Sequence, residues 1–162
     1  KNLGPHLLRA GGEPGLCYTC HADVQAQGYW PSHHPLKEGE MSCSDCHNPH
    51  GSELSAWRGA PTSRDLCLKC HAQYRGPFAV EHPPAQEDCT ICHSPHGSMN
   101  RDLLVASEPF LCQRCHADVH NPHVPASFRS SADLAQQALF FSDCTVCHGS
   151  IHGSDQSNTF TR

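Results

Sequence analysis

The sequence has few hydrophobic residues: they fill 37% of its 162 positions, and aromatic residues fill 7%. Typical soluble domains are about 45 to 50% apolar, so these side chains alone predict a poor core. No run approaches the roughly 18 apolar residues of a membrane-spanning helix, which predicts no membrane span in this chain. Lysine and arginine form no cluster and the formal charge is -5, so nucleic acid is not expected as a partner.

Cysteine and histidine are abundant instead, with twelve and fifteen copies that make up a sixth of the chain. Every cysteine falls in one of six C-x-x-C-H motifs, and chance alone would place histidine after all six pairs with a probability on the order of one in a million. C-x-x-C-H is the signature of c-type haem attachment. Cysteines three apart lie on one face of a helical turn, where their sulfurs can add to the two vinyl groups of one porphyrin.

The motifs predict six covalently bound haem c groups, numbered here haem 1 to haem 6 along the chain. The attachment cysteines are Cys17, Cys20, Cys43, Cys46, Cys67, Cys70, Cys89, Cys92, Cys112, Cys115, Cys144 and Cys147. The proximal iron ligands predicted for haems 1 to 6 are His21, His47, His71, His93, His116 and His148.

Two other interpretations of the cysteines are six disulfides and three zinc sites with four thiolates each. Neither explains the six histidines. Burial of the haems would also supply the apolar core that the side chains lack.

The six motifs are of two alternating types. The first type reads LC-x-x-CHA, and the second runs on into PHGS twice and IHGS once. The alternation predicts three dihaem modules of about 50 residues within one domain, at about 16–57, 58–105 and 106–156. The expected fold is an elongated, haem-cored array of these modules, mostly loops with short α-helices and little or no β-structure.

Short helices are expected around the first-type motifs, and turns around the second type. One helix should span 65–74 behind a cap at Thr62 or Ser63, and another should run from Pro109 to a point before Pro122. A further helix at 131–141 would pack against the last haem.

Nine histidines lie outside the motifs, and some of them are expected as distal iron ligands. Three follow their own motif histidine by three or four residues, a stretch that reaches only about 10 to 14 Å. Each of these must therefore bind a different haem and so join two haems. Three more lie between the two motifs of a module, in HHP, EHPP and NPHVP. The six distal candidates are His34, His50, His82, His96, His123 and His152.

Several assignments stay open at this point. His33 competes with His34 and His120 with His123, whereas His6 is expected to be a surface residue. We expect the PHGS-type histidine to bind the first haem of its own module and the HP-type histidine to bind the second. Ligation across modules is the alternative.

Methionine ligation is possible for at most two haems, because the chain has only Met41 and Met99. Both are expected to be packing residues.

An iron with two histidine ligands has no vacant position for a substrate, so the chain is expected to be an electron carrier and not an enzyme. With 27 residues per haem the polypeptide is too thin to insulate the haems, which predicts a multi-step wire between redox partners. One alternative is a subunit of a haem filament or of a larger electron-transfer complex. The other is a multihaem reductase of a small nitrogen substrate, which would need a haem with an open position.

Several stretches resemble a known family: HHPLKEGEMSCSDCHNPHGS, EHPPAQEDCTICHSPHGSMNRDLL, PFLCQRCH and CHGSIHGS. They are similar to the doubled-CxxCH multihaem c-type cytochromes of the MtrA and DmsE decahaem type, and more distantly to the pentahaem NrfB type. The resemblance implies a loop-rich protein with bis-histidine haems in near-linear order. Six haems are fewer than the decahaem members have, which is where this chain departs from the pattern.

The resemblance also implies a location and partners. Such proteins are exported to the periplasm or the cell surface, and they act in anaerobic respiration or extracellular electron transfer. Their expected partners are a quinol-side donor cytochrome and a terminal reductase or outer-membrane conduit. No export signal is visible at Lys1, so the numbering is expected to begin at a processed end.

Overall fold

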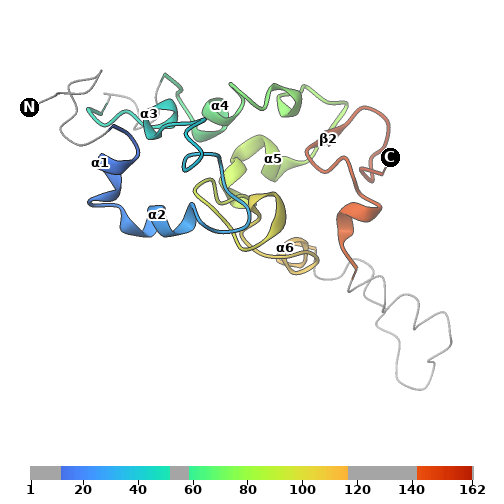
Figure 1. The fold of residues 1–162 in the computed structure, drawn as a ribbon. Helices are drawn as coiled ribbons and strands as arrows, with labels where there is room; N and C mark the ends of the chain where they lie inside the picture. The colour runs from blue at the N-terminus through green and yellow to red at the C-terminus, as the bar shows by residue number, and fades with distance from the viewer. Residues whose placement is uncertain (1–11, 52–58, 117–141, 162) are drawn as a thin grey trace, which may run out of the picture.

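A computed structural model describes residues 12–51, 59–116 and 142–161. These residues fold mostly as loops and turns with short helices, the longest of which, in the described ranges, has six residues. Figure 1 shows α1 and α2 at one end of the molecule, and β2 and the C-terminal residues at the other. The chain thus progresses from the first module to the third along one direction, and the loop-rich fold expected from the sequence is confirmed.

The elements are grouped here by the three predicted modules, in chain order. The first module contains α1 (Gly15–Tyr18), α2 (Ala22–Gln27) and α3 (Cys43–Cys46). The second contains α4 (Ser63–Cys67), η1 (Ala72–Tyr74), β1 (Val80–Glu81), α5 (Pro83–Glu87), η2 (Cys89–Ile91) and η3 (Arg101–Leu103). The third contains α6 (Phe110–Gln113), η5 (Cys144–Val146) and β2 (Gly153–Ser154).

The helices around the first-type motifs are shorter than expected. Helix α4 begins at the predicted cap, where Thr62 Oγ1 accepts a hydrogen bond of 3.0 Å from the amide of Asp65. It ends at Cys67, so the continuous helix expected over 65–74 is wrong. The reason is His71, whose backbone (φ -98°, ψ 46°) leaves the helical region before η1 begins.

The same break separates α1 from α2 at His21. Helix α6 ends at Gln113, so the helix expected to run from Pro109 towards Pro122 is also shorter than predicted. The helix expected at 131–141 lies outside the described residues.

Antiparallel pairing in the described residues is confined to three short places, one of which is an isolated bridge between His93 and Leu104 within the second module. Strands β1 and β2 join the second module to the third, with Val80 opposite Ser154 and Glu81 opposite Gly153. An isolated bridge between Ser32 and Ser98 joins the first module to the second. The expected near-absence of β-structure is confirmed.

The described polypeptide has almost no core of its own. Its only buried hydrophobic residues are Ala60, Leu68 and Leu104, and no side chain is fully buried. Met99 is 65% exposed, so its expected role as a packing residue against the rest of the chain is wrong. The apolar surface that would stabilise a folded domain must therefore come largely from bound groups.

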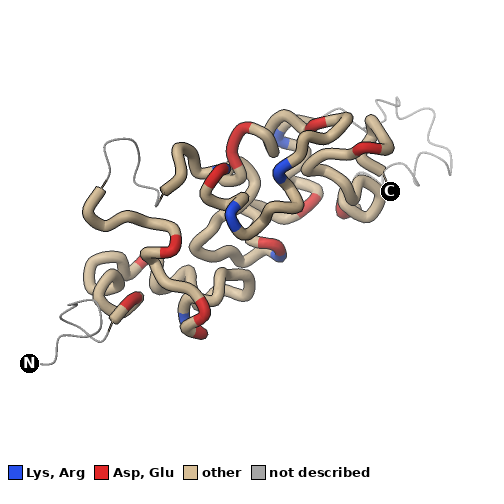
Figure 2. The backbone as a smooth tube through the Cα atoms, turned by 90° about the horizontal axis from the view of Figure 1, so that it is seen from above, with Lys and Arg blue, Asp and Glu red and all other residues tan. Residues whose placement is uncertain are grey.

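No helix in the described part of the chain is both long and apolar enough to cross a bilayer. Figure 2 shows acidic positions along the whole length of the tube, with the described Lys and Arg residues scattered among them. The charge distribution thus agrees with the absence of a basic cluster in the sequence.

Candidate haem centres

All six C-x-x-C-H motifs have the same kind of backbone turn. In each motif the amide of the histidine donates to the carbonyl of the first cysteine, as in His47 to Cys43 at 2.8 Å and His71 to Cys67 at 3.0 Å. This i to i-4 bond holds both cysteines and the histidine on one helical turn. All twelve cysteines are described and none forms a disulfide, so the structure gives no support to the disulfide interpretation.

Within each module, the first cysteines of the two motifs lie side by side. The Cys43 thiol hydrogen-bonds that of Cys17, and burial together with this neighbour raises the pKa of Cys43 to about 12. The thiols of Cys67 and Cys89 are paired in the same way. The third pair is Cys112 and Cys144, whose sulfurs lie within 4.8 Å of one another.

Between modules, the second cysteine of one motif lies near both cysteines of the next motif. Cys46 lies close enough to Cys70 for their charges to interact, and Cys92 stands in the same relation to Cys115. Alternating contacts through first and second cysteines therefore connect the six motifs in chain order. Haems attached at these sulfurs would form one continuous row.

Four of the six distal candidates face a proximal histidine across a gap. The facing pairs and their ring-centroid distances are His96 and His47 at 5.9 Å, His34 and His71 at 6.3 Å, His152 and His93 at 6.1 Å, and His82 and His116 at 6.1 Å. Aromatic rings pack at centroid separations of about 4.5 to 7 Å, and this separation lies within that range. It also matches an iron between two imidazoles, since metal to imidazole-nitrogen bonds of about 2.0 to 2.1 Å on each side place the ring centroids about 6 Å apart.

Each of these pairs joins two neighbouring modules. His96 of the second module faces His47 of the first module, and His34 of the first module faces His71 of the second. The third module contributes His152 to the second module and receives His82. The pairing expected within modules is wrong for these four histidines, and the alternative across modules fits the geometry.

The glycine after the PHGS-type histidine permits this exchange. A Cβ on Gly97 would lie 2.1 Å from the carbonyl oxygen of Gln27, at the end of α2 in the first module. A Cβ on Gly153 would lie equally close to the ring of Phe78 in the second module. Only a residue without a side chain lets these turns approach the preceding module so closely, and the histidine beside each glycine is thereby carried to its partner.

Backbone carbonyls orient several of these rings. The Nδ1 of His34 lies 2.7 Å from the carbonyl of Pro95, and the Nδ1 of His93 lies 2.7 Å from that of Asp102. His148 makes the same contact with Thr159 at 2.6 Å. Since a carbonyl can only accept, Nδ1 carries the proton and Nε2 keeps the lone pair that a metal needs.

The hydrogen bonds distinguish His33 from His34 as candidate iron ligands. Both ring nitrogens of His33 are engaged, Nδ1 with the Trp30 carbonyl at 2.6 Å and Nε2 with the Glu38 carboxylate at 3.2 Å. The ring of His34 is hydrogen-bonded through Nδ1 to the Pro95 carbonyl, and its centroid lies 6.3 Å from that of His71. The geometry therefore favours His34 as the ligand.

Burial prepares three of the distal candidates to bind metal. Burial, followed by the facing histidine, lowers the pKa values of His96 and His152. The same two causes lower the pKa of His82, against a hydrogen bond to the Ile151 backbone. These imidazoles keep their neutral, metal-binding form below the usual pKa of about 6.5.

Of the two other distal candidates, only His50 lies among the described residues. The rings of His21 and His50 face no other histidine in the described ranges. His123 and its competitor His120 lie outside the described residues, as does His6. The four-thiolate zinc alternative finds no match among the described residues, where the one group of three close ligand atoms belongs to Glu108, Cys112 and Cys144.

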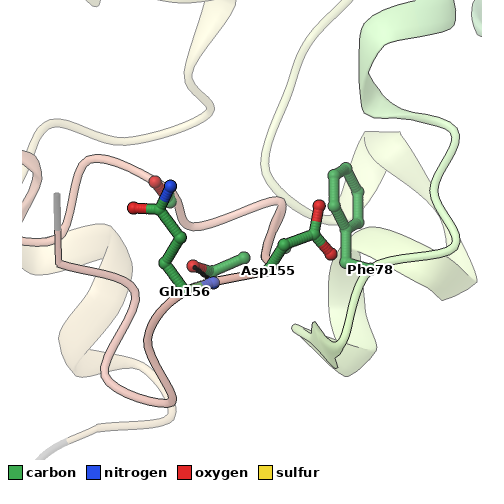
Figure 3. Close-up of a pocket in the computed structure, with 6 residues that line it drawn as sticks. Phe78, Asp155 and Gln156 are labelled. Carbon is green, nitrogen blue, oxygen red and sulfur yellow. Dashed lines mark hydrogen bonds between the residues drawn. The ribbon is translucent and has the colours of Figure 1, made fainter.

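A hollow of about 310 Å³ lies beside the His152 turn. Phe78, Gly153 and Gln156 are among the residues that line it, and Figure 3 shows Asp155 reaching towards the Phe78 segment. The carboxylate of Asp155 accepts a hydrogen bond of 2.8 Å from the amide of Ala79. This contact is a second tie between the last two modules near the His93 and His152 pair.

Sequence reasoning missed several residues near these centres. Tyr74 lies 4.2 Å from the His152 ring and 6.4 Å from that of His71, measured between ring centroids, and so lies between two predicted iron ligands. Glu13 and Glu108 bind backbone amides inside the second-type motifs. Only the recurrence of Glu-Pro four residues before Cys17 and Cys112 could have drawn attention to the two glutamates.

Comparison with known proteins agrees with these features. The family model described as the doubled CXXCH motif matches residues 33–76 and 82–121, which is more than half of the chain. Over 154 residues the chain is 39% identical to the multihaem cytochrome MtrA of Shewanella baltica (strain OS185). The alignment covers 92% of this chain and 46% of that protein, so the chain spans less than half the length of this relative.

Proposed function

Because the chain belongs to the doubled-CXXCH family of multihaem cytochromes, we propose that it is a hexahaem c-type cytochrome that carries electrons stepwise between redox partners. Haem c supplies a one-electron iron couple when bound. The described residues fit this group in two ways. They bury few hydrophobic side chains of their own, and pairs of imidazoles face each other at a distance that an iron would span.

The facing imidazole pairs are the observation that carries the proposal. They support bis-histidine ligation of haem 2 by His47 and His96 and of haem 3 by His71 and His34. In the same way they support ligation of haem 4 by His93 and His152 and of haem 5 by His116 and His82. His50 and His123 are the remaining distal candidates for haem 1 and haem 6, which His21 and His148 would hold from the proximal side.

The alternating cysteine contacts support a single electron path. Haems 1 and 2 would be attached at the neighbouring sulfurs of Cys17 and Cys43, and haems 2 and 3 at the neighbouring sulfurs of Cys46 and Cys70. The same alternation continues to Cys144. Electrons would then pass in order from haem 1 to haem 6, or in reverse.

Location and partners follow from the family resemblance. We propose a periplasmic or cell-surface protein that takes electrons from a quinol-side donor cytochrome. It would pass them to a terminal reductase or an outer-membrane conduit. Saturated ligation would leave the irons without a substrate position, which favours electron transfer over catalysis.

The test is haem quantification by pyridine haemochrome together with EPR of the oxidised protein. We expect six haems per chain with low-spin signals from the four irons of the facing pairs, and no turnover of nitrite or hydroxylamine. Fewer haems, or a high-spin signal from one of those four irons, would overturn the ligand set. A high-spin iron accompanied by turnover would instead favour a reductase.

A further inference from the structure

Two glutamates tie together the haem-attachment segments of the first and third modules. Glu13 Oε2 accepts a hydrogen bond of 2.8 Å from the amide of Ser44, and Glu108 Oε2 accepts one of 2.9 Å from the amide of Thr145. Each glutamate lies four residues before the first cysteine of its module, and each amide belongs to the residue directly after the first cysteine of the second motif. The same contact therefore occurs twice.

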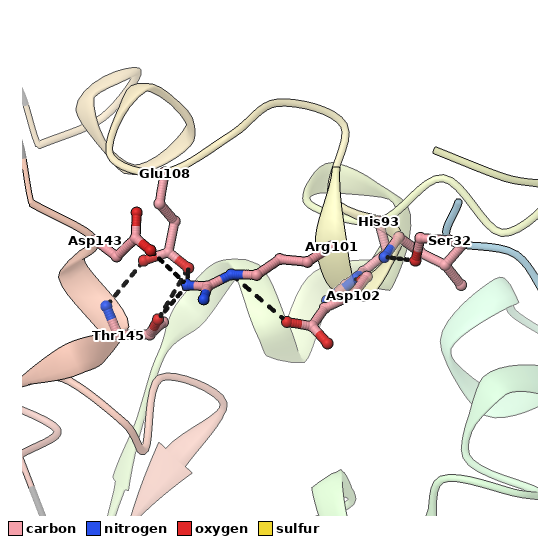
Figure 4. A network of polar contacts seen from close by, with 8 residues as sticks. Ser32, His93, Arg101, Asp102, Glu108, Asp143 and Thr145 are labelled. Atoms are coloured by element: carbon pink, nitrogen blue, oxygen red, sulfur yellow. Dashed lines mark hydrogen bonds and ion pairs between the residues drawn. The ribbon is translucent and has the colours of Figure 1, made fainter. Parts of the chain in front are cut away.

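Glu108 is the more deeply buried of the two and has additional partners. Its side chain is 5% exposed, and Oε1 accepts hydrogen bonds from Thr145 Oγ1 at 2.9 Å and from Arg101 Nη2 at 3.0 Å. Figure 4 shows this network and the Arg101 side chain that enters it from η3. Burial raises the pKa of Glu108, but the Thr145 amide and Arg101 outweigh burial, so the net pKa is lowered and the group is ionised at neutral pH.

The carboxylate lies directly against two attachment sulfurs. An oxygen of Glu108 is within 4.8 Å of the sulfurs of both Cys112 and Cys144. The three do not form a metal site, because both sulfurs are committed to haem 5 and haem 6 in the proposed function. A fixed negative charge is thus held at the junction of the two predicted haems.

We infer that Glu108 is a positioning residue that holds haems 5 and 6 together and lowers their reduction potentials, and that Arg101 partly offsets its charge. The inference rests on the proposed function. A reduced haem carries one more negative charge than an oxidised haem, so a nearby buried carboxylate disfavours reduction. Arg101 lies 3.1 Å from Asp143 and 3.9 Å from Asp102 as well, so its positive charge opposes three carboxylates around the same junction.

The experiment is a spectroelectrochemical titration of the haem-loaded protein and three variants. Glu108→Gln keeps the shape of the side chain and removes its charge, and we expect about a third of the haem absorbance to titrate at more positive potential. Arg101→Gln removes the offsetting charge, and the same fraction should titrate at more negative potential. Glu40→Gln is the matched control, since Glu40 is exposed and no charged side chain in the described residues pairs with it.

The opposite signs distinguish electrostatics from simple loss of structure. Curves for Glu108→Gln that coincide with the wild type, or shifts of both variants in one direction, would overturn the inference. Haem content is measured first. A wild type without six haems would refute the proposed function, whereas six haems with unresponsive potentials would refute this inference alone.

Discussion

Replacement of Gly97 by alanine should disturb both stability and the ligation of a single haem. The new Cβ would lie 2.1 Å from the carbonyl oxygen and 2.7 Å from the carbonyl carbon of Gln27, whereas real Cβ atoms essentially never approach closer than 3.0 Å. The neighbour is backbone, so it cannot rotate away. The turn must therefore move by about 1 Å, and overpacking of this kind typically costs about 1 to 3 kcal/mol.

In the proposed function the movement would reach the iron of haem 2, because His96 directly precedes Gly97. The ring of His96 faces that of His47 at 5.9 Å, and a displacement of about 1 Å is large compared with a metal to nitrogen bond of about 2.0 Å. We therefore expect partial conversion of haem 2 to a high-spin state, together with a lower midpoint of denaturant unfolding at an unchanged slope.

The assay combines urea unfolding with EPR of the oxidised protein. Gly15→Ala is the matched control, because a Cβ at Gly15 would meet no atom within 4 Å. It lies in α1, so the substitution should not lower the unfolding midpoint and should leave the EPR spectrum unchanged. A Gly97→Ala variant with wild-type stability and a fully low-spin spectrum would refute the close approach of the first two modules.

Three further predictions concern the imidazoles and the haems. His152→Ala should convert one haem, that of His93, to high spin in the EPR spectrum, while His33→Ala should leave all haems low spin; the reverse result would contradict the ring pairing. The pKa values of His82, His96 and His152 are lowered in the folded chain. Just below the ordinary histidine pKa of about 6.5, these side chains therefore bind protons in the unfolded chain but not in the folded chain. The free energy of unfolding should therefore fall as pH drops from 6.5 towards 5, and urea unfolding that is independent of pH over this range would contradict the buried neutral rings. Chain produced without haem should lack cooperative unfolding by circular dichroism, because it buries only three hydrophobic residues in the described ranges; a cooperative transition would show that the polypeptide has its own core.

The sequence by itself determined the local chemistry of the six centres. The C-x-x-C-H spacing lies within one helical turn, so the positions of the two cysteines and the proximal histidine depend only on neighbouring backbone. The sequence also predicted the helix cap at Thr62, because a cap depends on residues next to it in the chain. It predicted the poor core as well, because the low apolar content is a property of composition.

The extent of the helices was less predictable. Propensity favoured a helix through His71, but the backbone leaves the helical region at that residue, as it also does at His21. The choice between His33 and His34 depended on carbonyls supplied by other segments, the Pro95 carbonyl in the case of His34.

Only the tertiary structure decided which histidine faces which. One motif lies between His34 and His71 along the chain, and two lie between His47 and His96. The distal candidates have similar local sequences in the three modules. Selection among equivalent partners comes from how the modules pack, through the close approach at Gly97 and the β1–β2 pairing. Such contacts bring together segments of two modules, and a repeated motif cannot specify them because each copy of the motif is locally alike.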